Sequence, residues 1–288
     1  MAQLQCFKTL WGCNGTAVEV VNQALYEGFD GIEGPLPQTK AEVSDFISAL
    51  RQAELNYIAE IATTGSFVPD RRLSINDHLQ SLRQQLTQLI DVPAALVSCL
   101  GGCDAWPLTQ SVEFFHRAME LASAFERTIS FETHRGRSLF NPWITRDILA
   151  QIPELRLTFD ISHWAVVCEG LQPSEEALIK TLAHHCQHLH ARVGYDQGPQ
   201  VPDPRQGVYQ QNFAQHLHIW RQLWVQQVQC GQGVITVTPE FGPDGYQYRN
   251  VQGTENLVNL DEINRFMMTA LRQQFQQLFF TETNAKSA

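Results

Sequence analysis

The chain lacks the features that mark several large classes of protein. Lys and Arg number 20 against 30 Asp and Glu, which gives a net charge of −10, and the basic residues form no run or stripe. Because phosphate contacts supply much of the affinity for nucleic acid, no nucleic-acid partner is expected. No stretch approaches the roughly 20 apolar residues of a membrane span, and the N-terminal segment does not resemble a signal peptide. We therefore expect a cytoplasmic protein with no membrane partner.

Two common kinds of site are also missing. The seven cysteines form no C-x2-C pair, so packed, reduced thiols are expected instead of a zinc cage or a redox site. No G-x-G-x-x-G follows the first predicted strand, and this motif marks sheets that bind dinucleotides. We expect no organic cofactor.

What the chain does contain is a repeated alternation of a short β-branched or aromatic run with a longer segment of helical spacing. This alternation is typical of βα units. The strand candidates are 4–12, 28–36, 55–65, 94–102, 128–136, 155–164, 188–194 and 234–243. Eight units predict one (β/α)8 barrel domain over residues 1–288, with a long active-site loop at about 194–209 and a frayed tail at 283–288.

The polar faces of the last four strands favour a closed barrel over an open sheet. In 128–136, for example, Ser130, Glu132 and His134 share one face, whereas Ile129 and Phe131 share the other. An open parallel sheet covered by helices on both sides should be apolar on both faces. In a barrel, one face packs on helices while the other converges on a polar mouth.

The helical segments carry apolar stripes that predict core-facing sides. One stripe is formed by Val112, Phe115, Met119 and Ala122. Asn141 followed by Pro142 predicts the start of the fifth helix, because asparagine caps helices and proline suits their first turn. A last helix is expected over 260–279.

Glu132, Asp160, His190 and Glu240 each lie near the carboxyl end of a predicted strand, on its inward face. Barrel closure should bring these four side chains to one mouth. Three carboxylates in a partly desolvated cavity need a counter-ion, and oxygen and imidazole ligands suit Mn²⁺, Mg²⁺, Co²⁺ or Zn²⁺. The sequence therefore predicts one divalent metal ion on these residues.

Four segments carry a resemblance to a known family. Residues 131–136 (FETHRG), 159–164 (FDISHW), 188–192 (HLHAR) and 238–242 (TPEFG) resemble the last four strands of the xylose isomerase-like barrels. This superfamily includes sugar phosphate isomerases and epimerases, and also the type 2 family of endonucleases that cut abasic sites. In the first hundred residues, only the strand that ends in Glu33 resembles it.

The resemblance implies an activity and roles for particular residues. In the ketose 3-epimerases of this superfamily, the positions of Glu132, Asp160, His190 and Glu240 bind the metal. The two glutamates also exchange a proton with the substrate through an enediolate. The histidine of the D-x-x-H motif, here His163, contacts the substrate. The chain is thus expected to isomerise or epimerise a small sugar, sugar phosphate or related hydroxy-carbonyl compound.

Other residues are candidates for substrate contact. Arg135, Arg137 and Arg192 would suit a phosphate or carboxylate on the substrate, although they could equally pair with Glu33, Glu60 or Asp203. His134 faces the same way as Glu132. The remaining candidates are Glu33, Trp106 and Trp164, of which the two tryptophans could form the walls of a sugar site or simply pack in the core.

Three alternatives stay open. An endonuclease IV-like phosphodiesterase would add histidine ligands on the third and fourth strands, where this chain has none. A hydride-shift isomerase would need a second metal, for which Asp196 and Asp203 are candidates without the family's spacing. A barrel that binds a metabolite without catalysis is the third alternative. The substrate, the metal and the oligomeric state are not determined by the sequence.

Overall fold

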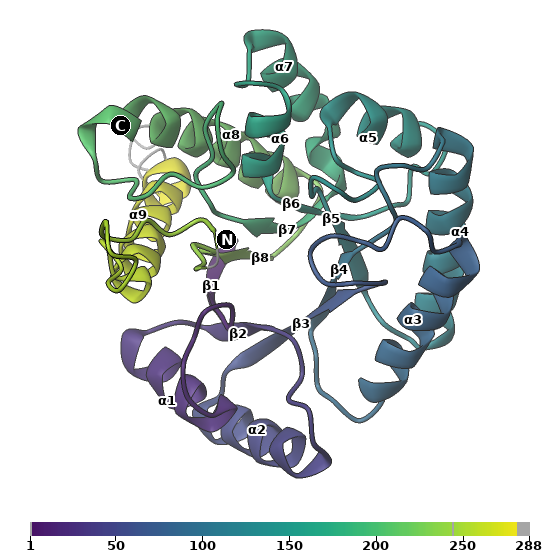
Figure 1. Cartoon of the computed structure of the whole chain (residues 1–288), viewed down its shortest axis with the longest axis horizontal. Helices are drawn as coiled ribbons and strands as arrows, with labels where there is room; N and C mark the ends of the chain where they lie inside the picture. Colours follow the sequence, from purple (N-terminus) through teal and green to yellow (C-terminus); the bar gives the residue numbers. More distant parts are fainter. Residues whose placement is uncertain (1, 244, 281–288) are drawn as a thin grey trace.

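The computed structural model describes residues 2–243 and 245–280. Its eight parallel strands pair in chain order and close into a barrel, in which β1 bonds to both β2 and β8 (Figure 1). The strands are β1 (Gln3–Thr9), β2 (Gly31–Gly34), β3 (Asn56–Ala62), β4 (Leu96–Leu100), β5 (Ile129–Glu132), β6 (Leu157–Phe159), β7 (Cys186–His190) and β8 (Val234–Thr238). The predicted (β/α)8 barrel is confirmed.

Helices surround the barrel (Figure 1). They are α1 (Ala17–Glu27), α2 (Lys40–Ala53), α3 (Ile75–Gln88), α4 (Leu108–Ala124), α5 (Pro142–Leu149), α6 (Ile161–Val167), α7 (Pro173–Leu182), α8 (Gln210–Gln229) and α9 (Leu260–Phe280). Asn141 caps α5 by accepting the Ile144 N–H at 2.8 Å, as predicted. None of the helices within the described residues is long and apolar enough to cross a membrane.

The predicted strand 155–164 is wrong in its second half. β6 ends at Phe159, and α6 begins at Ile161. The Asp160 side chain accepts the backbone N–H of Ser162 at 2.9 Å, which caps the helix at its first turn. His163 and Trp164 therefore lie on a helix above the barrel and not on a strand. The predicted tail at 283–288 lies outside the described residues.

The barrel interior is arranged in layers. The bottom layer is apolar and consists of Phe7, Ile58 and Leu96. Above it, the Thr158 hydroxyl lies 2.7 Å from Ser130 Oγ and 3.1 Å from Ser98 Oγ. These hydroxyls come from the polar strand faces that the sequence predicted, and they pair with one another so that their burial is compensated. The charged groups form the layer above, at the carboxyl ends of the strands.

Candidate metal centre

Glu132, Asp160, His190 and Glu240 converge on one point. One ligand atom from each lies within 4.8 Å of the others, and all four side chains are buried. Glu132 and His190 are the last residues of β5 and β7, Asp160 follows β6 directly, and Glu240 lies two residues beyond β8. The convergence predicted from the strand ends is therefore present in the structure.

Glu33 determines the orientation of the His190 ring. Its carboxylate oxygens lie 2.9 Å from His190 Nε2 and 3.0 Å from His188 Nε2. Burial alone would raise the pKa of Glu33, but the two histidines hold it well below its usual range. Glu33 thus lies behind His190, where it orients the ring, and does not line the mouth where substrate contact was expected.

The other ring nitrogen of His190 supports a metal. Nδ1 is buried, and no group in the described part of the chain accepts or donates a hydrogen bond there. It lies 3.2 Å from Glu240 Oε2 and 3.6 Å from Glu132 Oε1. An unsatisfied imidazole nitrogen among carboxylate oxygens is the donor set that a divalent cation takes. These residues fit a metal ion.

The pKa values in the centre reflect burial and crowding. Burial opposes a charged imidazolium, yet the carboxylates of Glu240, Glu33 and Glu132 hold the pKa of His190 well above its ordinary value. Burial raises the pKa of Glu132 to about 7, although His190 opposes this. A cation would therefore have to displace protons from Glu132 and His190 in order to bind.

We expect the affinity for Mn²⁺ to fall as the pH drops below about 7. Below the raised pKa, Glu132 carries a proton that competes with the metal, and His190 adds to the competition. Each displaced proton weakens binding about tenfold per pH unit. Calorimetric titration with Mn²⁺ in buffers of different ionisation enthalpy measures both the affinity and the protons released. An affinity that stays constant from about pH 5.5 to 8 would contradict the site.

Arg192 and Ser162 hold Asp160 from two sides. Arg192 donates to Asp160 Oδ2 at 2.5 Å, and the Ser162 hydroxyl donates to Oδ1 at 2.5 Å. Arg192 pairs with none of the three acidic residues expected from the sequence, Glu33, Glu60 and Asp203. It bonds to Asp160 instead. Burial opposes the charge of Arg192, but Asp160 and Glu240 raise its pKa. The guanidinium is fixed beside the ligand group.

His163 and His134 pack against each other next to this guanidinium, with their ring planes tilted by 52°. Their ring centroids lie 3.8 Å apart, and Arg192 donates to His163 Nε2 at 2.7 Å. Burial first, and then the neighbouring positive groups, lower the pKa of both histidines well below the ordinary value. A neutral His163 that accepts at Nε2 carries its hydrogen on Nδ1. Both Nδ1 atoms are buried without a hydrogen-bond partner among the described residues.

A small cavity of about 20 Å³ lies over the centre. Its walls are Trp11, Glu60, Phe67, Leu100, Glu132, His134, Arg192, Glu240 and Tyr246. Trp11 contacts Phe67 and Tyr246 with ring centroids 5.5 Å apart in each case, and Arg192 lies 5.5 Å from the rings of Trp11 and Tyr246. A Cβ on Gly242 would lie 2.2 Å from the Trp11 ring, so only glycine fits there. The aromatic side chains close the mouth.

The sequence patterns did not indicate Trp11, Phe67 or Tyr246, and they indicated Glu60 only as a possible partner of the arginines. The sequence could have indicated Glu60 as a site residue, because it occupies the inward face of the predicted strand 55–65. Burial, followed by the charges of Glu240, Glu33 and Glu132, raises its pKa to about 8. The aromatics come from loops after β1, β3 and β8, whose conformation leaves no periodic pattern.

Six predicted substrate contacts do not line the cavity: Glu33, Arg135, Arg137, His163, Trp106 and Trp164. Arg137 is buried, and its guanidinium donates to the backbone carbonyls of residues 64, 66, 67 and 102, which excludes the expected contact with substrate in this arrangement. Trp164 is fully buried and donates to the Leu139 carbonyl at 3.0 Å, whereas Trp106 packs on His78 and Phe114. Arg135 lies at the rim and donates to the Tyr246 hydroxyl at 3.3 Å.

Comparison by sequence finds no protein-family model and no curated protein that matches the chain. Solved structures do match. An L-ribulose 3-epimerase has a TM-score of 0.67 at 13% identity, covering 100% of this chain and 99% of its own. A D-allulose 3-epimerase from Methylomonas sp. has a TM-score of 0.62 at 15% identity, covering 95% and 100%. A xylose isomerase-like TIM barrel protein from Mycobacterium smegmatis, in complex with magnesium, has a TM-score of 0.62 at 12% identity, covering 94% and 97%.

The chain shares the (β/α)8 barrel fold of these proteins. Identities this low support the fold and not an activity.

Two amide side chains fix the peptide that follows Glu240. Asn264 of α9 exchanges hydrogen bonds with the Phe241 N–H and C=O at 3.0 and 3.1 Å, and Gln200 does the same for Gly242 at 3.0 Å each.

Gln200 belongs to the predicted active-site loop at 194–209. The loop does not line the cavity, but through Gln200 it holds the segment that carries Glu240. Two buried amide side chains thus fix the backbone on the C-terminal side of this ligand. That the loop acts in catalysis stays a prediction.

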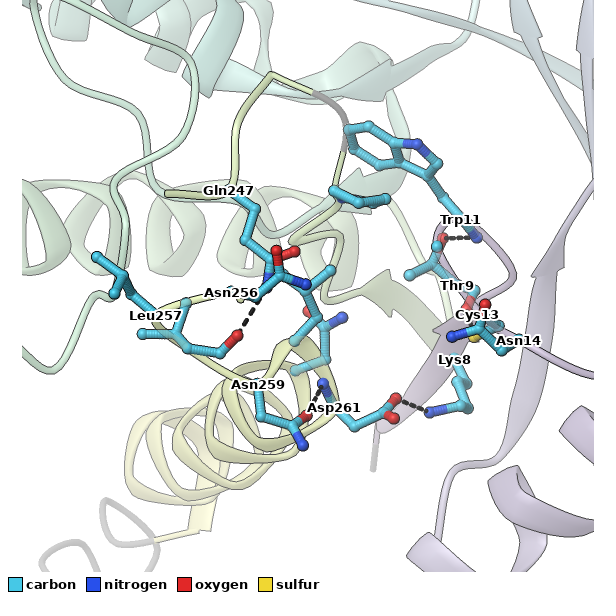
Figure 2. Close-up of a pocket in the computed structure, with 15 residues that line it drawn as sticks. Lys8, Thr9, Trp11, Cys13, Asn14, Gln247, Asn256, Leu257, Asn259 and Asp261 are labelled. Atoms are coloured by element: carbon cyan, nitrogen blue, oxygen red, sulfur yellow. Dashed lines mark hydrogen bonds and ion pairs between the residues drawn. The ribbon is translucent and has the colours of Figure 1, made fainter. Parts of the chain in front are cut away.

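A larger pocket of about 680 Å³ lies on the same rim of the barrel, between the loops after β1 and β8 (Figure 2). Trp11 is the residue it shares with the cavity over the centre. Several of its polar groups pair with each other: Lys8 bonds to Asp261 at 2.8 Å, and Gln247 donates to the Val258 carbonyl at 2.6 Å. The first contact joins β1 to α9, and the second lies within the loop between β8 and α9.

Proposed function

We propose that the chain is a divalent-metal-dependent isomerase or epimerase of a small sugar or a related hydroxy-carbonyl compound. The observation that carries the proposal is the buried ligand group of Glu132, Asp160, His190 and Glu240 around an unsatisfied His190 Nδ1. The fold supports it, since D-allulose and L-ribulose 3-epimerases share this barrel.

The proposed metal ligands are the four residues of this group. Three carboxylates and one imidazole suit Mn²⁺, Mg²⁺, Co²⁺ or Zn²⁺ better than a thiophilic ion. When bound, such an ion would supply positive charge that polarises a carbonyl and makes the neighbouring C–H more acidic. Glu33 would keep His190 in the ligating orientation through the bond to Nε2.

The proton transfers are assigned to this chain's own carboxylates. Glu132 and Glu240 both border the cavity and come from β5 and from beyond β8, on different sides of the barrel. One would accept the proton next to the substrate carbonyl, and the other would deliver a proton to the opposite face. His134 and Arg192 line the cavity and would donate hydrogen bonds to substrate oxygens, with His163 bonded to Arg192 and Arg135 near the rim. Trp11, Phe67 and Tyr246 would exclude water.

The extra histidine ligands of an endonuclease-like trimetal cluster are not found on β3 or β4 in the described part of the chain. β3 ends at Ala62 and β4 at Leu100. The histidine near the end of β3 is His78, whose two ring nitrogens lie 2.7 and 3.0 Å from the hydroxyls of Thr63 and Thr64. Both nitrogens are engaged, so His78 does not replace the missing ligands.

The decisive experiment incubates the Mn²⁺-loaded protein with a panel of ketoses and ketose phosphates in D₂O. We expect one substrate to acquire solvent deuterium at the carbon next to its carbonyl, and to lose this exchange after chelation of the metal. Conversion without incorporation of deuterium would favour a hydride shift. If no compound acquires deuterium and the protein cleaves DNA at abasic sites, the nuclease alternative replaces the proposal.

A further inference from the structure

Glu60 is an acidic side chain of the cavity for which the metal centre gives no role. It lies on β3 with its carboxyl at the cavity wall, near Glu132 and Glu240. It belongs to none of the groups whose ligand atoms lie within 4.8 Å of one another. Glu60 is therefore not part of the proposed ligand set.

The other carboxylates around the centre have partners. Glu33 bonds to two histidines, Asp160 bonds to Arg192 and Ser162, and Glu240 lies 3.2 Å from His190. For Glu60, no hydrogen bond or ion pair with another described residue is found. A partly buried carboxyl without a partner is unfavourable, and such groups are typical of sites where a ligand supplies the missing contact.

The position of Glu60 indicates what this contact is. In the closed strand order, β3 is four strands from β7 and so lies across the barrel from it. Arg192, which follows β7, places hydrogen-bond donors on the far side of the cavity, whereas Glu60 offers acceptors. A molecule between them would present an oxygen acceptor to Arg192 and a donor to Glu60.

We propose that Glu60 is a substrate-binding residue that accepts a hydrogen bond from a hydroxyl group of an uncharged polyhydroxy-carbonyl compound. This inference rests on the proposed function. An ionised Glu60 would repel a phosphate or carboxylate, and a protonated Glu60 could offer it only one donor. In either state, Glu60 favours a hydroxyl at this position and selects against a sugar phosphate whose anionic end points towards β3.

The test is calorimetric binding of D-allulose and its 6-phosphate to the Mn²⁺-loaded wild type, Glu60→Gln and Glu60→Ala. A hydrogen bond to a carboxylate predicts that both variants bind D-allulose about 10- to 100-fold more weakly, and that the preference of the wild type for the unphosphorylated sugar shrinks. Glu120→Gln, at an exposed glutamate of α4, is the matched control and should bind as the wild type does.

Titration with Mn²⁺ alone separates the outcomes. The affinity of Glu60→Gln for Mn²⁺ should stay within about threefold of the wild type, because the residue is not a ligand. Loss of Mn²⁺ binding would make Glu60 a ligand and overturn the inference, as would equal D-allulose binding by wild type and Glu60→Gln. If the wild type exchanges solvent deuterium into no compound of the panel and binds neither the sugar nor its phosphate, the proposed function fails and the inference fails with it.

Discussion

Replacement of Glu240 by Gln is expected to reduce turnover by about 10³-fold or more, and Glu132→Gln should do the same. Each substitution removes a negative charge from the ligand group and a proton acceptor from the cavity, while it preserves the size of the side chain. The loss should appear in kcat, because the proton transfer itself is impaired. It is measured as the rate of solvent-deuterium exchange into the substrate found by the panel.

A control at an exposed glutamate, Glu120→Gln, should leave the rate unchanged. The metal content of each variant must be measured alongside the rate. Exchange at a near-normal rate in metal-loaded Glu132→Gln and Glu240→Gln would show that neither glutamate carries the proton, and the mechanism would have to be abandoned.

Replacement of Arg137 by Met is expected to lower the free energy of unfolding by about 3 kcal/mol. The guanidinium donates to four backbone carbonyls, among them those of Thr64 and Gly102, and is fully buried. Methionine fills much of the volume but leaves these carbonyls without donors. Because Phe67, whose carbonyl is also held, closes the cavity, the substitution should weaken substrate binding as well.

Urea unfolding of the metal-free protein measures this effect. The matched control is Arg146→Met, which removes an exposed arginine paired with Asp147 and should change the stability by less than about 1 kcal/mol. If Arg137→Met were as mild as this control, the four carbonyl contacts would not stabilise the loops, and Arg137 would again be a candidate for substrate contact.

The convergence of the four side chains could be predicted from the sequence because their positions depend only on strand order and side-chain alternation. A barrel brings the carboxyl ends of its strands together, so Glu132 at the end of β5 and His190 at the end of β7 must face the same mouth. Asp160 was placed on a strand that was too long. Its local sequence alternates like a strand, and the helix becomes visible only through the cap that its side chain forms with Ser162.

What the sequence could not give depends on loop conformation. Arg137 and Arg192 have the same chemistry and both follow barrel strands. Only the folded loops show that one binds backbone carbonyls while the other binds Asp160. The sequence indicated Glu33 as a substrate contact. In the structure its carboxylate lies 2.9 Å from His190 Nε2, where it orients the ring. The closure of the mouth by Trp11 and Tyr246 likewise requires three-dimensional contacts between distant loops.

The binding of one divalent ion by Glu132, Asp160, His190 and Glu240 is tested most directly by anomalous diffraction from crystals of the protein loaded with Mn²⁺. We expect one strong anomalous peak per chain within about 2.0–2.4 Å of a donor atom from each of the four residues, with His190 ligating through Nδ1. A peak elsewhere, or none at saturating Mn²⁺, would contradict it.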